Sequence, residues 1–182
     1  MDYTIDNSHS SIEFDAKHMV FTTVRGSFKD FEGTLTTDGD DYSTLKGEIV
    51  VKAAGVETGD AKRDEHLRSA DFFDVEKFPT IKFVPTSVVT KDATHYVVTG
   101  DLTIKDVTKP LELKAEIQGV INDPWGNART ALNLTSTINR KDWGLEWNMV
   151  LDAGNLLVSE KININVEAAI LRKLEVTASA AA

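Results

Sequence analysis

The sequence predicts an all-β protein, an eight-stranded antiparallel up-and-down barrel with one or two short helices. Three observations support this fold class. Apolar and polar residues alternate with period two over much of the 182-residue chain, as in strands with one buried face. Turn-forming residues separate the alternating runs. The links after residue 79 are mostly short, so consecutive strands should pair antiparallel.

Eight strands are expected, and the last of them has the clearest pattern. In "KININVEAAI" an apolar residue occupies every second position from Ile162 to Ile170. Eight such strands can close into a barrel or stack as a sandwich, and closure has the advantage of leaving no open edge. The expected strands are 9–15, 26–36, 45–52, 79–90, 94–104, 110–121, 129–138 and 156–170.

Glycines mark the reversals and one close approach. Asp38-Gly39 and the segment "DPWG" at 123–126 are typical of tight turns between strands. Gly100 lies inside an expected strand, which indicates a bend or a place where another group comes near the backbone.

One segment departs from the strand pattern. "RDEHLRSADFFDVEKFPTIKF", residues 63–83, is crowded with charge and contains His66. Asp60 can cap a helix over the good helix formers that follow, and Pro79 prevents its continuation. We expect a short helix across a barrel end or seam, with Asp64 and Arg68 paired on its surface. A second helical turn is possible at 16–21.

Composition excludes several classes of protein. The net charge of −9 opposes binding to nucleic acids and anionic surfaces. There is no Cys, which excludes disulfides, thiolate catalysis and Cys-based metal sites. The length suits one domain, which we place at residues 1–172, with a C-terminal extension over 173–182 that is flexible at its end.

The first residues, "MDYTIDNSHS", lack the basic start and the apolar run of a secretory signal. No stretch reaches the length of a transmembrane helix, so no integral membrane segment is expected. We therefore expect a cytoplasmic protein, or a periplasmic one if a leader was removed.

Catalytic and metal-binding patterns are not apparent. The four His residues lack the spacing of a metal signature, no Ser stands in a GxSxG elbow, and the Gly residues occur singly. Asp64, Glu65 and His66 are acid–base candidates, and a structural role in a charged helix is the simpler interpretation. We expect no enzyme activity, no catalytic residue, no metal and no cofactor.

A partly hollow barrel is consistent with several small residues at expected inward positions. An eight-stranded barrel can be filled by bulky side chains or, where some are small, can hold one ligand. Trp143 and Trp147, in "NRKDWGLEW", either line such a cavity or close its mouth. His18 can meet a ligand's polar head. The small residues are Ala16, Gly100, Ala115, Ala131 and Ala168.

Five blocks of the chain, in order, resemble the YceI-like family of polyisoprenoid-binding proteins with a lipocalin-like barrel. The similarity covers most of residues 3–168. The blocks are "YTIDNSHSSIEFDAKHMVFTTVRGSF", "GDAKRDEHLRSADFFDVEKFPTIKF", "VTGDLTIKDVTKPLEL", "INRKDWGLEWN" and "LVSEKININVEAA".

The resemblance implies an extended barrel with a helix and an apolar channel that takes a long amphiphile, such as a polyprenyl chain, another lipid or a quinone. It also implies a possible homodimer, and many members are periplasmic. It supplies no catalytic residue. The expected role is carriage, storage or sequestration of the ligand. The expected ligand-binding residues are Phe14, His18, Phe21, Arg25, Leu67, Phe72, Phe73, Phe83, Leu102, Leu113, Trp143 and Trp147.

Two other functions remain open. One is an enzyme acting on a lipid-like substrate through Asp64, Glu65 and His66. The other is a stress-related or structural interaction module with a filled core. If the ligand has an anionic head, the acidic chain needs local bases to bind it, and Lys17, Arg25 and Arg140 are candidates.

Overall fold

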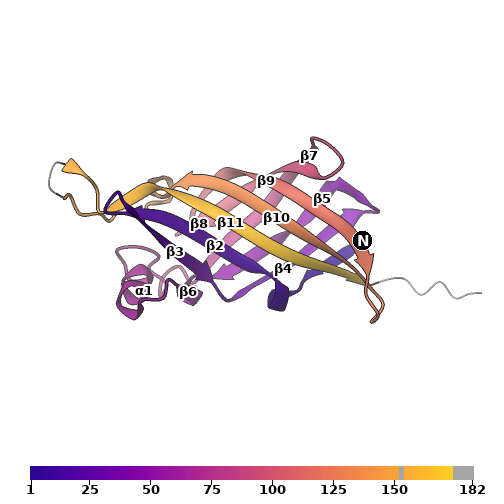
Figure 1. Cartoon of the computed structure of the whole chain (residues 1–182), viewed down its shortest axis with the longest axis horizontal. Coiled ribbons are helices and arrows are strands. Elements are labelled where there is room, and N and C mark those ends of the chain that lie inside the picture. Colours follow the sequence, from indigo (N-terminus) through magenta and orange to yellow (C-terminus); the bar gives the residue numbers. More distant parts are fainter. Residues whose placement is uncertain (152–153, 174–182) are drawn as a thin grey trace, which may run out of the picture.

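The computed structural model describes residues 1–151 and 154–173, and shows an elongated barrel of eleven strand segments (Figure 1). The end of the predicted C-terminal extension, 174–182, lies outside the described residues. The strands are β1 (Asp2–Ile5), β2 (Ser11–His18), β3 (Thr22–Phe28), β4 (Phe31–Asp38), β5 (Asp41–Lys52), β6 (Val56–Glu57), β7 (Thr80–Thr90), β8 (His95–Ile104), β9 (Val107–Asn122), β10 (Asn127–Asn139) and β11 (Val158–Lys173).

The eleven segments occupy eight positions around the barrel, because three positions are each made of two segments. The short 3₁₀ turn η1 (Asn7–His9) separates β1 from β2, and η2 (Ala53–Gly55) separates β5 from β6. A break after Phe28 separates β3 from β4. β1 pairs with β4, and β2 pairs with β3. The segments β1 and β2 therefore form one interrupted strand, and β3 and β4 form the interrupted strand beside it.

Strand β11 closes the sheet. It pairs with β10 from Lys161 to Lys173, and on its other side with β2 and then β1. All of these pairings are antiparallel, and β7 to β11 follow one another as an up-and-down meander. This closure confirms the predicted eight-stranded barrel over a sandwich.

The alternation predicted for the strands also holds. The inward residues of β11, from Ile162 to Ile170 at every second position, all line the interior of the barrel. The same is true of Leu111, Leu113, Ala115 and Ile117 in β9. A one-residue shift in register would turn either set outward, so these faces set the pairing.

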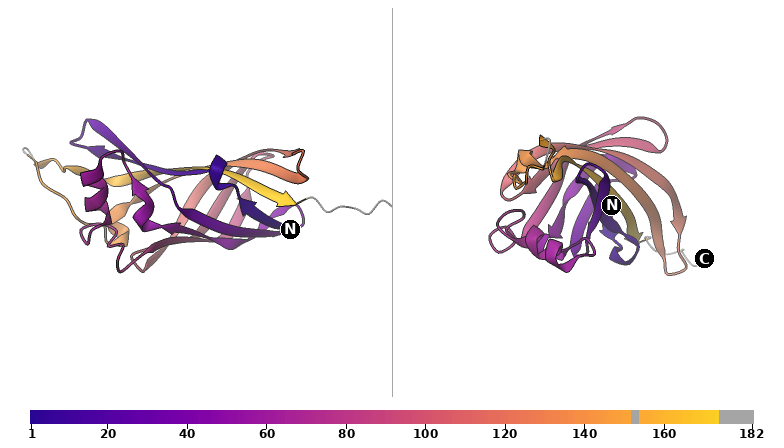
Figure 2. Two further views of the ribbon diagram at one scale, coloured as in Figure 1. Left: turned by 90° about the horizontal axis from the view of Figure 1, so that it is seen from below. Right: turned by 60° about the vertical axis from the view of Figure 1, so that its left-hand side comes forward.

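Helix α1 (Ala61–Arg68) lies against one end of the barrel, and the N-terminus lies at the opposite end (Figure 2). As predicted, Asp60 caps it: its side chain accepts from the backbone N–H groups of Lys62 and Arg63, at 3.0 and 3.1 Å. No helix within 1–151 and 154–173 is long and apolar enough to cross a membrane.

The predicted ion pair between Asp64 and Arg68 was wrong. Asp64 is buried and accepts from the backbone N–H and the hydroxyl of Thr58, at 2.8 and 2.5 Å. Arg68 donates to the carbonyls of Ala54 and Val56, each at 2.8 Å. Both side chains bond to the segment from Ala54 to Thr58, which includes β6 and whose backbone groups need partners. They therefore attach the helix to the barrel.

The helical turn considered for 16–21 was also wrong, because these residues form a β-hairpin between β2 and β3. Met19 and Val20 make its turn with φ values of 50° and 69°. Met19 N–H donates to the carbonyl of Leu157 at 2.8 Å, which ties the hairpin to the chain just before β11.

Candidate ligand-binding cavity

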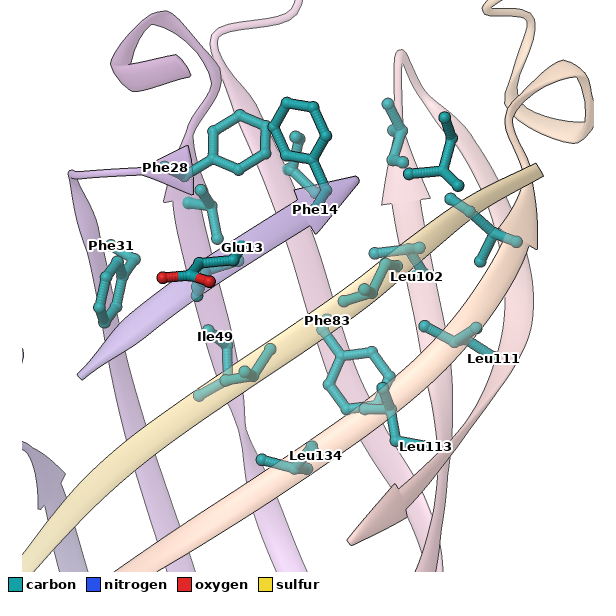
Figure 3. Close-up of a pocket in the computed structure, with 18 of the residues that line it drawn as sticks. Glu13, Phe14, Phe28, Phe31, Ile49, Phe83, Leu102, Leu111, Leu113 and Leu134 are labelled. Atoms are coloured by element: carbon teal, nitrogen blue, oxygen red, sulfur yellow. The ribbon is translucent and has the colours of Figure 1, made fainter. Parts of the chain in front are cut away.

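The barrel encloses a cavity of about 660 Å³, within the range of pockets that hold small ligands. Its lining comes from all eight strand positions and from the α1 segment, and it is overwhelmingly apolar. It extends from Lys17 and Leu157, near α1, to Leu35 and Ile170 toward the other end. In Figure 3 side chains from several walls, among them Phe14, Phe83 and Leu134, surround the same space.

Aromatic rings form much of the wall near α1. The rings of Phe14 and Phe28 lie 5.7 Å apart, and Phe28 meets Phe73 edge-on at 5.6 Å. His66, Phe72 and Trp147 form a second cluster, in which the His66 ring lies edge-on to both others at 5.1 and 4.6 Å. Such tilted and edge-on contacts are the favourable ones for aromatic pairs.

Nine of the twelve predicted ligand-binding residues line the cavity. They are Phe14, His18, Leu67, Phe72, Phe73, Phe83, Leu102, Leu113 and Trp147. Contact of each with a ligand stays a prediction.

The other three do not line the cavity. Phe21 projects from the tip of the β2–β3 hairpin and is 88% exposed. Arg25 lies on β3 with an exposed side chain, outside the lining. Trp143 is buried in η3 (Arg140–Trp143), but its indole N–H donates to the carbonyl of Leu102 at 3.0 Å. It borders a second, more polar depression beside β9, β10 and β11.

Several lining residues were not predicted, although alternation in β4 and β5 carries a signal for them. Leu35, Leu45, Ile49 and Val51 all line the cavity. Among the small residues expected inside, Ala16, Ala115 and Ala168 line it, whereas Ala131 is exposed on β10.

Positive charge gathers at the end of the cavity next to α1. The charged lining residues from α1, its cap, the end of β2 and η3 are four bases and one acid: Lys17, Lys62, Arg63 and Arg140 against Asp60. The remaining charged lining residues are Glu13, Lys82 and Glu167. An excess of bases here contrasts with the net charge of −9 of the whole chain.

Most of these charged groups already have protein partners. Lys17 Nζ donates to the hydroxyl of Thr23 at 2.8 Å, and Arg63 Nε donates to the hydroxyl of Thr58 at 2.7 Å. Arg140 is buried, and this burial lowers the pKa of its guanidinium, while Glu160 opposes the shift. Arginine nevertheless stays charged.

The acid–base candidates do not form a catalytic arrangement with one another. Asp64 is bonded to Thr58, and Glu65 is exposed and outside the lining. His66 lines the cavity, but its Nε2 lies 2.8 Å from a carboxylate oxygen of Asp71. In the described part of the chain, no three His, Cys, Asp or Glu side chains are placed to hold a metal ion.

A closed eight-stranded barrel with a long apolar cavity defines a class of lipocalin-like barrel proteins. The model of the YceI-like domain matches residues 3–170, so the chain belongs to the YceI-like family.

Comparison with relatives and solved structures agrees with this family. A UPF0312 protein of Pseudomonas savastanoi is 40% identical over 147 residues, which cover 80% of this chain and 77% of the relative. The YCEI protein of Campylobacter jejuni is 30% identical, with a TM-score of 0.75 over 87% of this chain and 90% of that one. A polyisoprenoid binding domain from Saccharophagus degradans has the same fold, with a TM-score of 0.71 over 94% and 98% of the two chains at 14% identity.

Proposed function

We propose that this protein binds a long apolar amphiphile, a polyisoprenoid or a similar lipid or quinone, inside the barrel. Its role is then to carry, store or sequester that molecule. The observation that carries the proposal is the 660 Å³ cavity, whose apolar lining is contributed by all strand positions.

The energetics of burial favour such a ligand. Each CH₂ group removed from water contributes about 0.8 kcal/mol, so an isoprene unit contributes about 3–4 kcal/mol before ordering costs. A few units are enough for useful affinity without any polar contact. A cavity with an almost wholly apolar wall is suited to this kind of binding.

Similar proteins support the same conclusion. The chain belongs to the YceI-like family, and one protein of the same fold, from Saccharophagus degradans, is described as a polyisoprenoid binding domain. The open cavity favours a ligand-binding barrel over an interaction module with a filled core.

We propose binding without chemical change. The acid–base candidates serve the structure instead: Asp64 holds Thr58, and His66 packs between Phe72 and Trp147 while its Nε2 meets Asp71. Incubation of the protein with a polyprenyl alcohol should return that compound unaltered by mass spectrometry. A new product that forms with the native protein but not with the His66→Ala variant would support an enzyme instead.

The test of binding is mass spectrometry of organic extracts from the purified protein, compared between two variants. Ala115→Phe puts a ring into the lumen from β9, whereas Ala131→Phe adds the same ring to an exposed position on β10. We expect native protein and Ala131→Phe to retain a long-chain lipid, and Ala115→Phe to lose most of it. Extracts with no lipid, together with no uptake of polyprenyl alcohol in titration, would contradict the proposal.

A further inference from the structure

One nitrogen of a buried guanidinium lacks a partner at the α1 end of the cavity. Arg140 is 3% exposed. Its Nε donates to the carbonyl of Ser159 at 3.0 Å, and its Nη1 donates to the carbonyl of Leu145. Its Nη2 has no hydrogen-bond partner within 1–151 and 154–173, and it is the one buried side-chain nitrogen or oxygen there in this condition.

The charge of Arg140 also lacks a close counterion in the described part of the chain. Salt bridges within 4.0 Å join other pairs, and the nearby Glu160 is taken by Lys141, at 2.6 Å. Burial of an unpaired charge or of an unbonded N–H group is costly, so folded proteins normally provide a partner for it. The two carbonyls satisfy only part of the five N–H groups of a guanidinium.

Arg140 is among the residues that line the cavity. The ring of Phe72 lies 6.0 Å from its central carbon, and Phe72 in turn packs against Trp147 at 5.4 Å. Ser159 connects Arg140 to β2, because its carbonyl accepts from Arg140 Nε and its hydroxyl accepts from the backbone N–H of Lys17.

We propose that Arg140 Nη2 binds an anionic oxygen of the ligand's head group, a carboxylate or a phosphate ester, with the apolar chain extending along the barrel. This inference rests on the proposed function, because it concerns the head of a ligand held in the same cavity. The local excess of bases makes the α1 end the favourable end for an anion in an otherwise acidic protein.

The test compares ligands that share the same hydrocarbon chain and differ in their head groups. Hexadecanoic acid, hexadecyl phosphate and neutral hexadecanol are each titrated by displacement of an apolar fluorescent dye from delipidated protein. We expect the native protein to prefer an anion over the alcohol by about tenfold or more, the gain typical of a hydrogen bond to a charged group. The acid and the phosphate separate the two possible sources of anionic oxygen.

Arg140→Met should remove this preference and leave the affinity for hexadecanol close to native. Arg140→Lys, which keeps the charge, should restore part of it. Arg25→Met is the matched control, since that base is exposed on β3 and outside the lining, and it should keep the native preference.

Equal native affinity for acid, phosphate and alcohol would overturn the inference and leave the barrel's binding function intact. Retention of the preference in Arg140→Met would overturn it as well. If none of the three ligands displaced the dye, the proposed function itself would fail. The native comparison needs no variant, so the inference remains testable even if Arg140→Met does not fold.

Discussion

Two glycines make room for phenylalanine rings in the wall of the cavity. A Cβ atom built on Gly26 would lie 2.4 Å from the ring of Phe14, its cross-strand partner. One built on Gly100 would lie 2.4 Å from the ring of Phe83. These distances are much shorter than van der Waals contact. Both rings can therefore occupy their positions only because residues 26 and 100 are glycines. The close approach predicted at Gly100 is therefore confirmed.

Gly100→Val should destabilise the protein by about 1–3 kcal/mol, because the new side chain clashes with the ring of Phe83 and with the backbone carbonyl of Val84. Urea unfolding measures this change. Gly119→Val, on β9, is the matched control, since a Cβ there meets nothing within 4 Å. We expect the control to stay within about 0.5 kcal/mol of native. Equal stability of the two variants would contradict this account of Gly100.

Asp6 joins the first strand position to β10. Its carboxylate accepts from the hydroxyl of Ser8 at 2.6 Å, lies 2.9 Å from His9 Nδ1, and receives Arg129 Nη1 at 2.6 Å. Together these bonds, the one from Ser8 first, hold the pKa of Asp6 well below its ordinary value of 3.8. A lowered pKa means that the native state favours the ionised carboxylate.

Asp6→Asn should cost about 2 kcal/mol at neutral pH, since it removes hydrogen bonds to a charged group. The folded pKa lies below the unfolded one, so this contribution is complete above pH 4 and is lost as the pH falls toward the folded value. Denaturant unfolding at pH 7 and pH 3 measures the cost of the substitution and its loss at low pH. A difference from native that is the same at the two pH values would contradict the assignment, and exposed Asp101→Asn is the control.

Helix α1 is held to the barrel mainly by polar contacts. It has eight residues, too few to be stable alone in water. Arg68 and Asp64 attach it to η2, β6 and Thr58, while Leu67 faces the cavity. Two of the charged side chains in this segment therefore attach the helix to the barrel.

Arg68→Met should loosen α1 without opening the barrel. The carbonyls of Ala54 and Val56 lose their donors, which costs about 1–3 kcal/mol. Hydrogen exchange should accelerate in α1 and remain native in β8 and β9. Glu65→Gln, an exposed change in the same helix, should leave the exchange native. Uniform acceleration over the whole chain would show that the helix does not open as a separate unit.

Elements with strong alternation could be predicted from sequence, and elements set by tertiary context could not. The alternation in β9 and β11 correctly placed each inward residue. The β2–β3 turn escaped prediction because Met19 and Val20 adopt positive φ without a glycine or asparagine to indicate it. The expected strand 26–36 is in fact divided between β3 and β4. At the break between them, the backbone N–H of Lys29 donates to the carbonyl of Gly55.

The same division applies to the cavity. Phe14, Leu102 and Leu113 follow from their strand faces, and they line it. Aromatic residue type alone suggests Phe21 and Trp143 as cavity residues, but Phe21 lies at an exposed hairpin tip and the Trp143 indole is bonded to Leu102. The unpartnered nitrogen of Arg140 depends on the η3 turn and on distant Ser159, so no local pattern could indicate it.

At the scale of the whole molecule, closure joins the first strands to the last strand. β1 and β2 both pair with β11, so the last strand cannot form its second ladder before the first strands are in place. A barrel closed in this way leaves little free strand edge for pairing with other chains.

The space inside the barrel should make the folded protein sensitive to unfolding by hydrostatic pressure. Hydrostatic pressure favours the state of smaller volume, and unfolding eliminates internal voids in proportion to their size. Under the proposed function, the protein without ligand should therefore unfold at markedly lower pressure than the same protein loaded with a polyprenyl alcohol, as followed by tryptophan fluorescence in a high-pressure cell. Identical midpoints would mean that the guest does not occupy the 660 Å³ void.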